Sequence, residues 1–238
     1  MIVNECFVPF KDLHKGKTGI VIGCGPTAGM YDGSKHAIHI GCNELIYSEK
    51  LSLDYYFIGD AQVGWPDKQK TFFKDPEAYN SYKPNIAKFV RNHPQPDCNI
   101  LDCNSGNLVD HALHYNIAQP GMALGTFDRE REKDFQVDIT KNYMYSRLSI
   151  SFEMMQFALW TGLKRLYLVG HDCSYAQGTL YNPDHRAYDG VPRKGLVDAW
   201  LGFKKWSRIN YPDVDIMCVN PVAMNHFDHK LMHQIIEN

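Results

Sequence analysis

The sequence predicts an α/β protein with a Rossmann-like, open, mostly parallel sheet, helices on both faces and a lid loop. Three observations support this prediction. Short apolar runs rich in Val, Ile, Tyr and Leu end at turn-forming residues, as buried parallel strands do. Helical stretches alternate with these runs, and a glycine-rich turn follows the first of them. Strand–helix alternation is typical of a sheet with helices on both faces.

The elements follow from local patterns. Apolar residues recur every three to four positions over 146–162 and 195–210, which predicts an amphipathic helix in each stretch. Gly162 is a natural end for the first helix. The predicted strands are 19–23, 36–41, 54–59, 165–170 and 214–219, with 98–103 as a less regular sixth.

Two regions lack such a pattern. Residues 66–97 are polar, with Pro, Asn, Lys and aromatic residues, and we expect them to wrap the outside of the molecule. Residues 173–194 follow a strand directly, without periodicity, and long loops in compact domains are often functional. Ligands of open α/β sheets bind at the carboxyl ends of strands. We therefore predict a lid segment at 173–194 within a single domain spanning 1–238.

Composition excludes several classes of protein. Hydrophobic residues make up 44% and charged residues 22% of the chain, which indicates an ordered globular protein. The net charge is −2 and no basic stripe is present, so no nucleic-acid partner is expected. No secretion signal or membrane-spanning run is expected either. Seven cysteines, mostly beside apolar runs, predict reduced thiols in a cytoplasmic protein.

The turn "GCGPTA" at 23–28 formally fits the Gly-x-Gly-x-x-Ala form of the dinucleotide fingerprint. Small residues let a backbone approach phosphate, and a helix N-terminus offers unpaired N–H groups. Pro26 suits the first position of such a helix. The turn therefore predicts a phosphate-bearing ligand, with a tight, ligand-free turn as the alternative.

NAD fits this turn poorly. An acidic residue should end the second strand to hold the ribose hydroxyls, but Asn43 stands there, with Glu44 one position later. No hydride-transfer site is evident downstream. Another phosphate-bearing ligand is favoured.

Several segments, in order over 18–225, resemble the bacterial lipooligosaccharide sialyltransferases, which use CMP-activated sialic acid. The segments that carry the likeness are the 23–27 turn, Cys42-Asn43, Arg147-Leu148-Ser149 before "LYLVGHDCSY", the tyrosines at 175 and 181, and "CVNP" at 218–221. A wider group is also similar through its Gly-x-Gly-Pro-Ser turn and a "GxD" strand end, which "FIGDAQ" at 57–62 resembles. This group contains flagellin-glycosylation-associated proteins and archaeal hydroxymethylpterin diphosphokinases.

The resemblance implies a metal-independent, inverting glycosyltransferase. It implies that Tyr175 and Tyr181 stabilise the departing phosphate and that His185, on the lid, is the base for the acceptor hydroxyl. The alternatives are packing tyrosines and an exposed loop histidine. No cofactor and no bound metal are expected.

The same resemblance implies a donor site at the strand ends. Asp60 could instead hold Mg²⁺ in a diphosphokinase, and Ser149 could simply cap a helix. The predicted nucleotide- and donor-binding residues are Gly23, Cys24, Gly25, Pro26, Thr27, Asn43, Asp60, Gln62, Arg147, Ser149 and Asp172.

The implied partners are a CMP-sugar donor and a glycan acceptor, in a cytoplasmic protein. Peripheral contact with the inner membrane stays open, and the resemblance also implies a homo-oligomer. Two alternatives remain at this stage: a hydroxymethylpterin diphosphokinase-like enzyme using ATP and Mg²⁺, and a non-catalytic nucleotide-binding protein.

Overall fold

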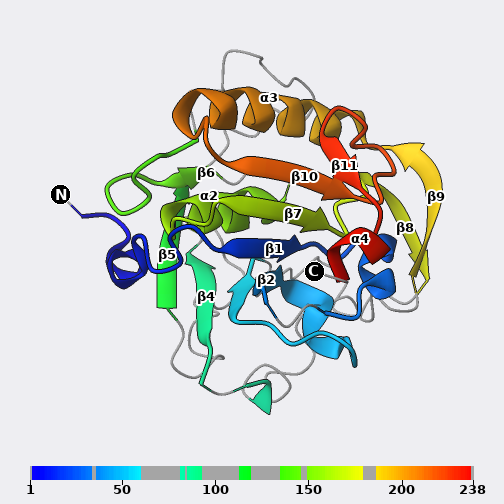
Figure 1. Cartoon of the computed structure of the whole chain (residues 1–238). Helices are drawn as coiled ribbons and strands as arrows, with labels where there is room; N and C mark the ends of the chain where they lie inside the picture. The colour runs from blue at the N-terminus through cyan, green and yellow to red at the C-terminus, as the bar shows by residue number, and fades with distance from the viewer. Residues whose placement is uncertain are drawn as a thin grey trace, which may run out of the picture.

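The computed structural model describes residues 2–33, 36–59, 81–83, 85–92, 113–118, 135–145, 149–178 and 186–236. Within them, nine strands form an open sheet in which every pairing is parallel, in the order β11-β10-β7-β1-β2-β3-β4-β5-β6 (Figure 1). This confirms the predicted Rossmann-like α/β class. The strands are β1 Thr18–Ile22, β2 Ile38–Cys42, β3 Tyr55–Ile58, β4 Ala87–Asn92, β5 Leu113–Ala118, β6 Met144–Tyr145, β7 Arg165–Val169, β10 Asp215–Val219 and β11 Asp228–Lys230.

The strand order reverses at β1. From β1 the chain builds the sheet outward through β2 to β6, and it then returns to place β7 against the other side of β1. The boundary between β1 and β7 is therefore a topological switch point, and ligands of open α/β sheets bind outside the carboxyl ends of the strands at such a point.

The five regular predicted strands are confirmed as β1, β2, β3, β7 and β10, with small shifts at their ends. Their interior residues are almost all buried in β1, β3 and β7, because layers of side chains cover both faces of the sheet. The less regular candidate at 98–103 lies outside the described residues.

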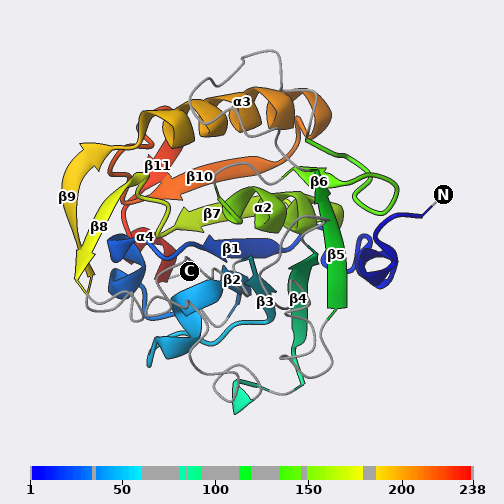
Figure 2. The same ribbon diagram turned by 180° about the vertical axis from the view of Figure 1, so that it is seen from behind.

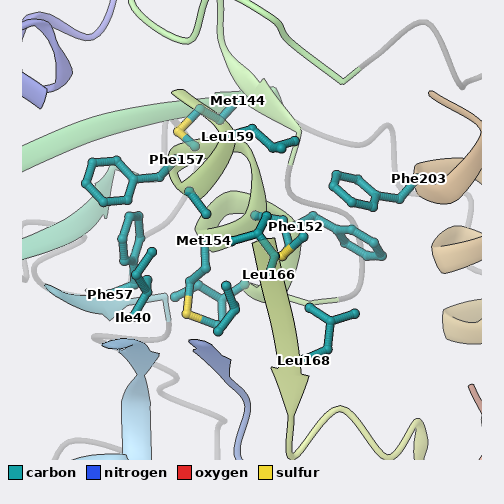
Figure 3. Close-up of a cluster of buried hydrophobic side chains, with 14 of the residues drawn as sticks. Ile40, Phe57, Met144, Phe152, Met154, Phe157, Leu159, Leu166, Leu168 and Phe203 are labelled. Atoms are coloured by element: carbon teal, nitrogen blue, oxygen red, sulfur yellow. The ribbon is translucent and has the colours of Figure 1, made fainter. Parts of the chain in front are cut away.

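One face of the sheet is covered by α2 (Ser151–Trp160) and α3 (Lys194–Asn210), which confirms both predicted helices. All ten residues of α2 are buried, because the helix contacts β1, β2 and also β6. Figure 3 shows α2 within an aromatic core, where Phe157 lies near Phe57 and Phe152 lies between the helix and Phe203 of α3. A helix buried on all sides is mostly apolar, and the buried polar side chains of Glu153 and Gln156 in α2 are hydrogen-bonded.

The opposite face is covered by shorter elements. The 3₁₀-helix η2 (Pro26–Met30) follows β1, the 3₁₀-helix η3 (Asn43–Tyr47) follows β2, and α4 (His233–Ile236) lies near the chain end. Leu45 and Ile235 from these elements pack with sheet residues such as Ile20 and Tyr56. A third 3₁₀-helix, η1 (Glu5–Phe10), packs Phe7 into the α2 side.

Two sequence interpretations were wrong in part. Residues 87–92, expected to wrap the outside, form β4 inside the sheet, with Phe89 and Val90 buried. The segment 173–194, expected to lack regular structure, contains β8 (Ser174–Gly178) and β9 (Arg186–Pro192), which pair antiparallel. This pair stands at the end toward which β1, β7 and β10 point (Figures 1 and 2), and β9 contacts η2.

Among the described helices, none combines the length and apolar character needed to cross a bilayer.

Candidate functional site

The glycine-rich turn after β1 packs directly against the backbone that follows β7. The Gly23 N–H donates to the Val169 carbonyl at 2.8 Å, and the Gly25 N–H donates to the Gly170 carbonyl at 2.9 Å. A Cβ atom on Gly25 would lie 2.5 Å from the Gly170 oxygen, and one on Gly23 would lie 2.7 Å from it. Both glycines are therefore required here by close backbone approach.

Asp172 holds this turn from the β7 side. Its Oδ2 accepts a hydrogen bond from the Thr27 N–H at 2.9 Å, and its Oδ1 accepts one from the Thr27 hydroxyl. We call this arrangement the Thr27–Asp172 clasp. Asp172 is only 3% exposed, and burial raises the pKa of its carboxyl group, while the bonds from Thr27 act in the opposite direction. Asp172 therefore acts on any ligand of the turn through the position of Thr27.

The element after the turn differs from the helix expected to bind phosphate. Pro26 does occupy the start of the helix, as predicted, but η2 is a 3₁₀-helix of five residues. The N–H groups of Gly25 and Thr27 already have acceptors in Gly170 and Asp172. A ligand phosphate can use these two amides only by displacing those acceptors.

His171 lies beneath the turn. Its Nε2–H donates to the Val21 carbonyl at 3.1 Å, and its ring meets Trp200 edge-on, with 5.3 Å between the ring centres. Burial lowers the pKa of His171 to about 4. The imidazole is therefore neutral near pH 7, with a structural role in joining β7 to β1.

Asn43 stands at the carboxyl end of β2, beside the turn. Its backbone is left-handed, with φ 44°, a conformation that asparagine adopts more readily than most residues. Its Oδ1 accepts from the Gly59 N–H at 3.0 Å, and its carbonyl accepts from the Tyr56 hydroxyl. Asn43 thus links the ends of β2 and β3 at the edge where the sequence predicts the ligand.

Cys24 points from the turn toward the end of β2. Its Sγ lies 3.4 Å from the Cys42 carbonyl oxygen and 3.9 Å from the Cys42 Sγ. Together with the Thr27–Asp172 clasp and Asn43, this contact completes a chain of polar contacts across the ends of β7, β1, β2 and β3.

A charged cluster that the sequence did not reveal joins β4, β5 and α2. The Arg91 guanidinium pairs with both carboxylate oxygens of Glu153, with 3.3 Å between Nε and Oε2, and the Tyr115 hydroxyl donates to Oε2. The Glu153 side chain is fully buried and that of Arg91 is 11% exposed. Burial, and then the nearby Glu153 charge, raise the pKa of Tyr115 well above its ordinary value. The signal in the sequence was the short apolar pair Phe89-Val90, which the flanking Lys88 and Arg91 obscured.

Ser149 lies just before α2. Its hydroxyl accepts from the Ser151 N–H at 3.2 Å and donates to the Ser151 hydroxyl at 2.8 Å. It thereby satisfies an N–H of the first turn of α2, which agrees with the helix-capping alternative.

Six further predicted site residues lie wholly or partly outside the described residues. The backbone of Tyr175 lies in β8, but its side chain lies outside the described residues. The further predicted residues that lie outside the described residues are Asp60, Gln62, Arg147, Tyr181 and His185. In the part of the chain that the structure describes, no group of three or more His, Cys, Asp or Glu side chains could hold a metal ion.

Comparison with known proteins supports the fold. No model of a known protein family matches the chain, and no curated protein matches it. Among solved structures, it is similar to the MAf glycosyltransferase from Magnetospirillum magneticum AMB-1, with a TM-score of 0.55 and 12% identity. The match covers 97% of this chain and 38% of that one. At this identity the likeness concerns the fold, and it does not extend to the sialyltransferases in particular. The chain thus has a fold found in a glycosyltransferase, and it spans less than half the length of that protein.

Proposed function

We propose that this chain is a glycosyltransferase that binds a nucleotide-sugar at the carboxyl ends of β1 and β7. The observation that carries the proposal is the 23–27 turn, packed against residues 170–172 at the topological switch point. The fold shared with a glycosyltransferase over 97% of the chain supports it.

The donor we propose is a CMP-activated sugar of the sialic acid type. The ordered resemblance of the 23–27 turn, Cys42-Asn43 and "CVNP" to sialyltransferases supports this choice. The Asp-x-Asp sequence at 213–215 lies at the start of β10, at the opposite edge of the sheet from the proposed site. Transfer would proceed without a metal ion and with inversion at the anomeric carbon.

In this reaction the bond between the anomeric carbon and the phosphate oxygen breaks, and CMP leaves with the electron pair. The acceptor hydroxyl oxygen forms the new bond from the opposite face, and its proton goes to the base. Tyr175 and Tyr181 would donate hydrogen bonds to the departing phosphate, and His185 would take the proton. Each hydrogen bond to a charged group is worth about 1.5–3 kcal/mol.

Ligand-induced stabilisation tests the donor class. The melting temperature should be measured with CMP, CDP, UDP, GDP, ATP and NAD, each with and without Mg²⁺. A cytidine nucleotide should raise it without Mg²⁺, since a ligand at 100 times its Kd stabilises the folded state by about 2.7 kcal/mol. Stabilisation by ATP with Mg²⁺ alone would favour a diphosphokinase-like enzyme. No stabilisation by any nucleotide would overturn the proposal.

Turnover tests the mechanism. Release of CMP from CMP-sialic acid should continue in the presence of a chelator, and it should slow about a hundredfold in Tyr175→Phe if the phenol stabilises the departing phosphate. Tyr143→Phe is the matched control, because Tyr143 is 52% exposed and lies outside the proposed site. Nucleotide binding without turnover of any donor would point to a non-catalytic binding protein.

A further inference from the structure

Two thiols meet at the edge of the candidate site. The Sγ atoms of Cys24 and Cys42 are 3.9 Å apart, and both cysteines are reduced in this structure. Cys24 lies in the turn after β1, and Cys42 ends β2, the parallel neighbour of β1. We call them the Cys24–Cys42 pair.

The backbone geometry suits a disulfide. Ile22 pairs with Gly41 in the parallel register, which brings the two cysteines to the adjacent ends of neighbouring strands. Continued past β1, this register places Gly23 opposite Cys42, so Cys24 is offset by one residue. A strand spacing of about 4.8 Å with a rise of about 3.3 Å per residue gives a Cα separation of about 6 Å, within the roughly 4.4–6.8 Å that disulfides span. A disulfide needs a sulfur–sulfur distance of about 2.0 Å, so the two sulfur atoms must approach by about 1.9 Å. Rotation of these short side chains is the movement required.

We propose that the Cys24–Cys42 pair is an oxidation site, at which a hydroperoxide closes a disulfide that locks the 23–27 turn and weakens nucleotide binding. The effect on binding rests on the proposed function, whereas formation of the disulfide does not. The Thr27–Asp172 clasp already holds the turn to the end of β7. A disulfide would also hold it to the end of β2, next to Asn43, so the turn could no longer adjust to a ligand.

The chemistry balances with hydrogen peroxide as the oxidant. The Cys24 thiolate attacks one peroxide oxygen, the O–O bond breaks, and a sulfenic acid and hydroxide form. The Cys42 thiolate then attacks the sulfenic sulfur, which forms the S–S bond and releases a second hydroxide. The two hydroxides take up the two thiol protons, so two thiols lose two electrons and the peroxide becomes two waters. A dithiol reductant reverses the reaction.

Exposure decides the order of these steps. Cys24 is partly exposed, whereas Cys42 is 2% exposed, so peroxide reaches Cys24 first and Cys42 resolves the sulfenic acid. Burial raises the pKa of Cys6, Cys173 and Cys218 to about 12, so few of these three thiols are ionised near pH 7. These three cysteines are suitable controls within the same chain.

Peptide mapping tests the disulfide. Trypsin releases Cys24 in peptide 18–35 and Cys42 in peptide 36–50, and neither peptide contains another cysteine. The full reduced chain should be treated with hydrogen peroxide, the remaining thiols blocked, and the digest analysed without reductant. We expect a species joining these two peptides, which Cys24→Ser abolishes and Cys6→Ser retains. Disulfides at other positions, or no joined peptide, would overturn the proposal.

Nucleotide affinity tests the consequence. After oxidation, the affinity for the nucleotide that stabilises the reduced chain should fall about tenfold, within the usual range of coupling between sites. Reductant should restore it, and Cys42→Ser, which removes the second sulfur atom and leaves the 23–27 turn intact, should resist the change. An unchanged affinity in the cross-linked protein would overturn the locking step. If the reduced chain binds no nucleotide, the proposed function fails, and peptide mapping alone decides the oxidation site.

Discussion

Two buried carboxylates near the carboxyl ends of the strands are held in different ways. Glu153 is paired with the Arg91 guanidinium and bonded by the Tyr115 hydroxyl, so a full positive charge compensates it. Asp172 is bonded by the N–H and hydroxyl of Thr27, which are dipoles, and burial raises its pKa. The ion pair, together with the Tyr115 hydroxyl, joins α2 to β4 and β5. The Thr27–Asp172 clasp depends on weaker partners and stands at the switch point, where a ligand would arrive.

The largest effect is expected from breaking the ion pair. Glu153→Gln removes the carboxylate that pairs with the largely buried Arg91 guanidinium, which should lower the free energy of unfolding by about 3–5 kcal/mol. Urea unfolding at pH 7 measures this loss. The double variant Arg91→Met, Glu153→Leu removes both charges and should cost far less or even stabilise the fold. Equal losses in the two variants would show that the charge balance is unimportant there.

Acidification should destabilise the β1–β7 side through His171. Its pKa is about 4 in the folded chain, below its ordinary value of 6.5, so the folded state binds fewer protons between these pH values. Stability should therefore fall as pH drops from 6.5 to 4, by on the order of 3 kcal/mol. Urea midpoints across this range measure the slope, which His171→Gln should reduce. Part of the slope that remains in His171→Gln comes from His14, because burial also lowers the pKa of His14.

Opening the Thr27–Asp172 clasp should cost less than breaking the ion pair. Asp172→Ala leaves the buried Thr27 N–H without its acceptor, which should lower the free energy of unfolding by about 1–3 kcal/mol. Asp172→Asn keeps a side-chain acceptor and removes the buried charge, so its loss should be clearly smaller in the same urea experiment. A larger loss for Asn than for Ala would contradict this description of the clasp.

The smallest effect is expected at Asn43. Asn43→Gly keeps the left-handed backbone favourable and removes the bond to Gly59, for a loss of about 0.5–1.5 kcal/mol. Asn43→Ala should lose about 1 kcal/mol more, because alanine is strained at φ 44°. Thermal unfolding of the two variants side by side measures the difference. If the order is reversed, the backbone conformation is not what selects asparagine.

The sequence predicted elements well where one pattern was strong. The run at 165–170 became β7, and the periodic stretch at 195–210 became α3, because burial on both faces or on one face leaves a clear apolar pattern. The sequence did not predict β4, because Lys88 and Arg91 interrupt its apolar residues. Arg91 can nevertheless be buried, since Glu153 from α2 compensates its charge. The sequence also failed to predict β8 and β9, whose regularity comes from their pairing with each other.

For the site, the sequence by itself determined the glycine turn, Pro26 at the start of the helix and the positions of Asn43 and Asp172 at strand ends. These features can be predicted from the sequence, because local steric and hydrogen-bonding preferences select particular residue types at neighbouring positions. Only the tertiary structure decided that Thr27 binds Asp172, that Arg91 pairs with Glu153 and that Cys24 meets Cys42. These contacts join residues far apart in the chain, and the order of the strands brings them together.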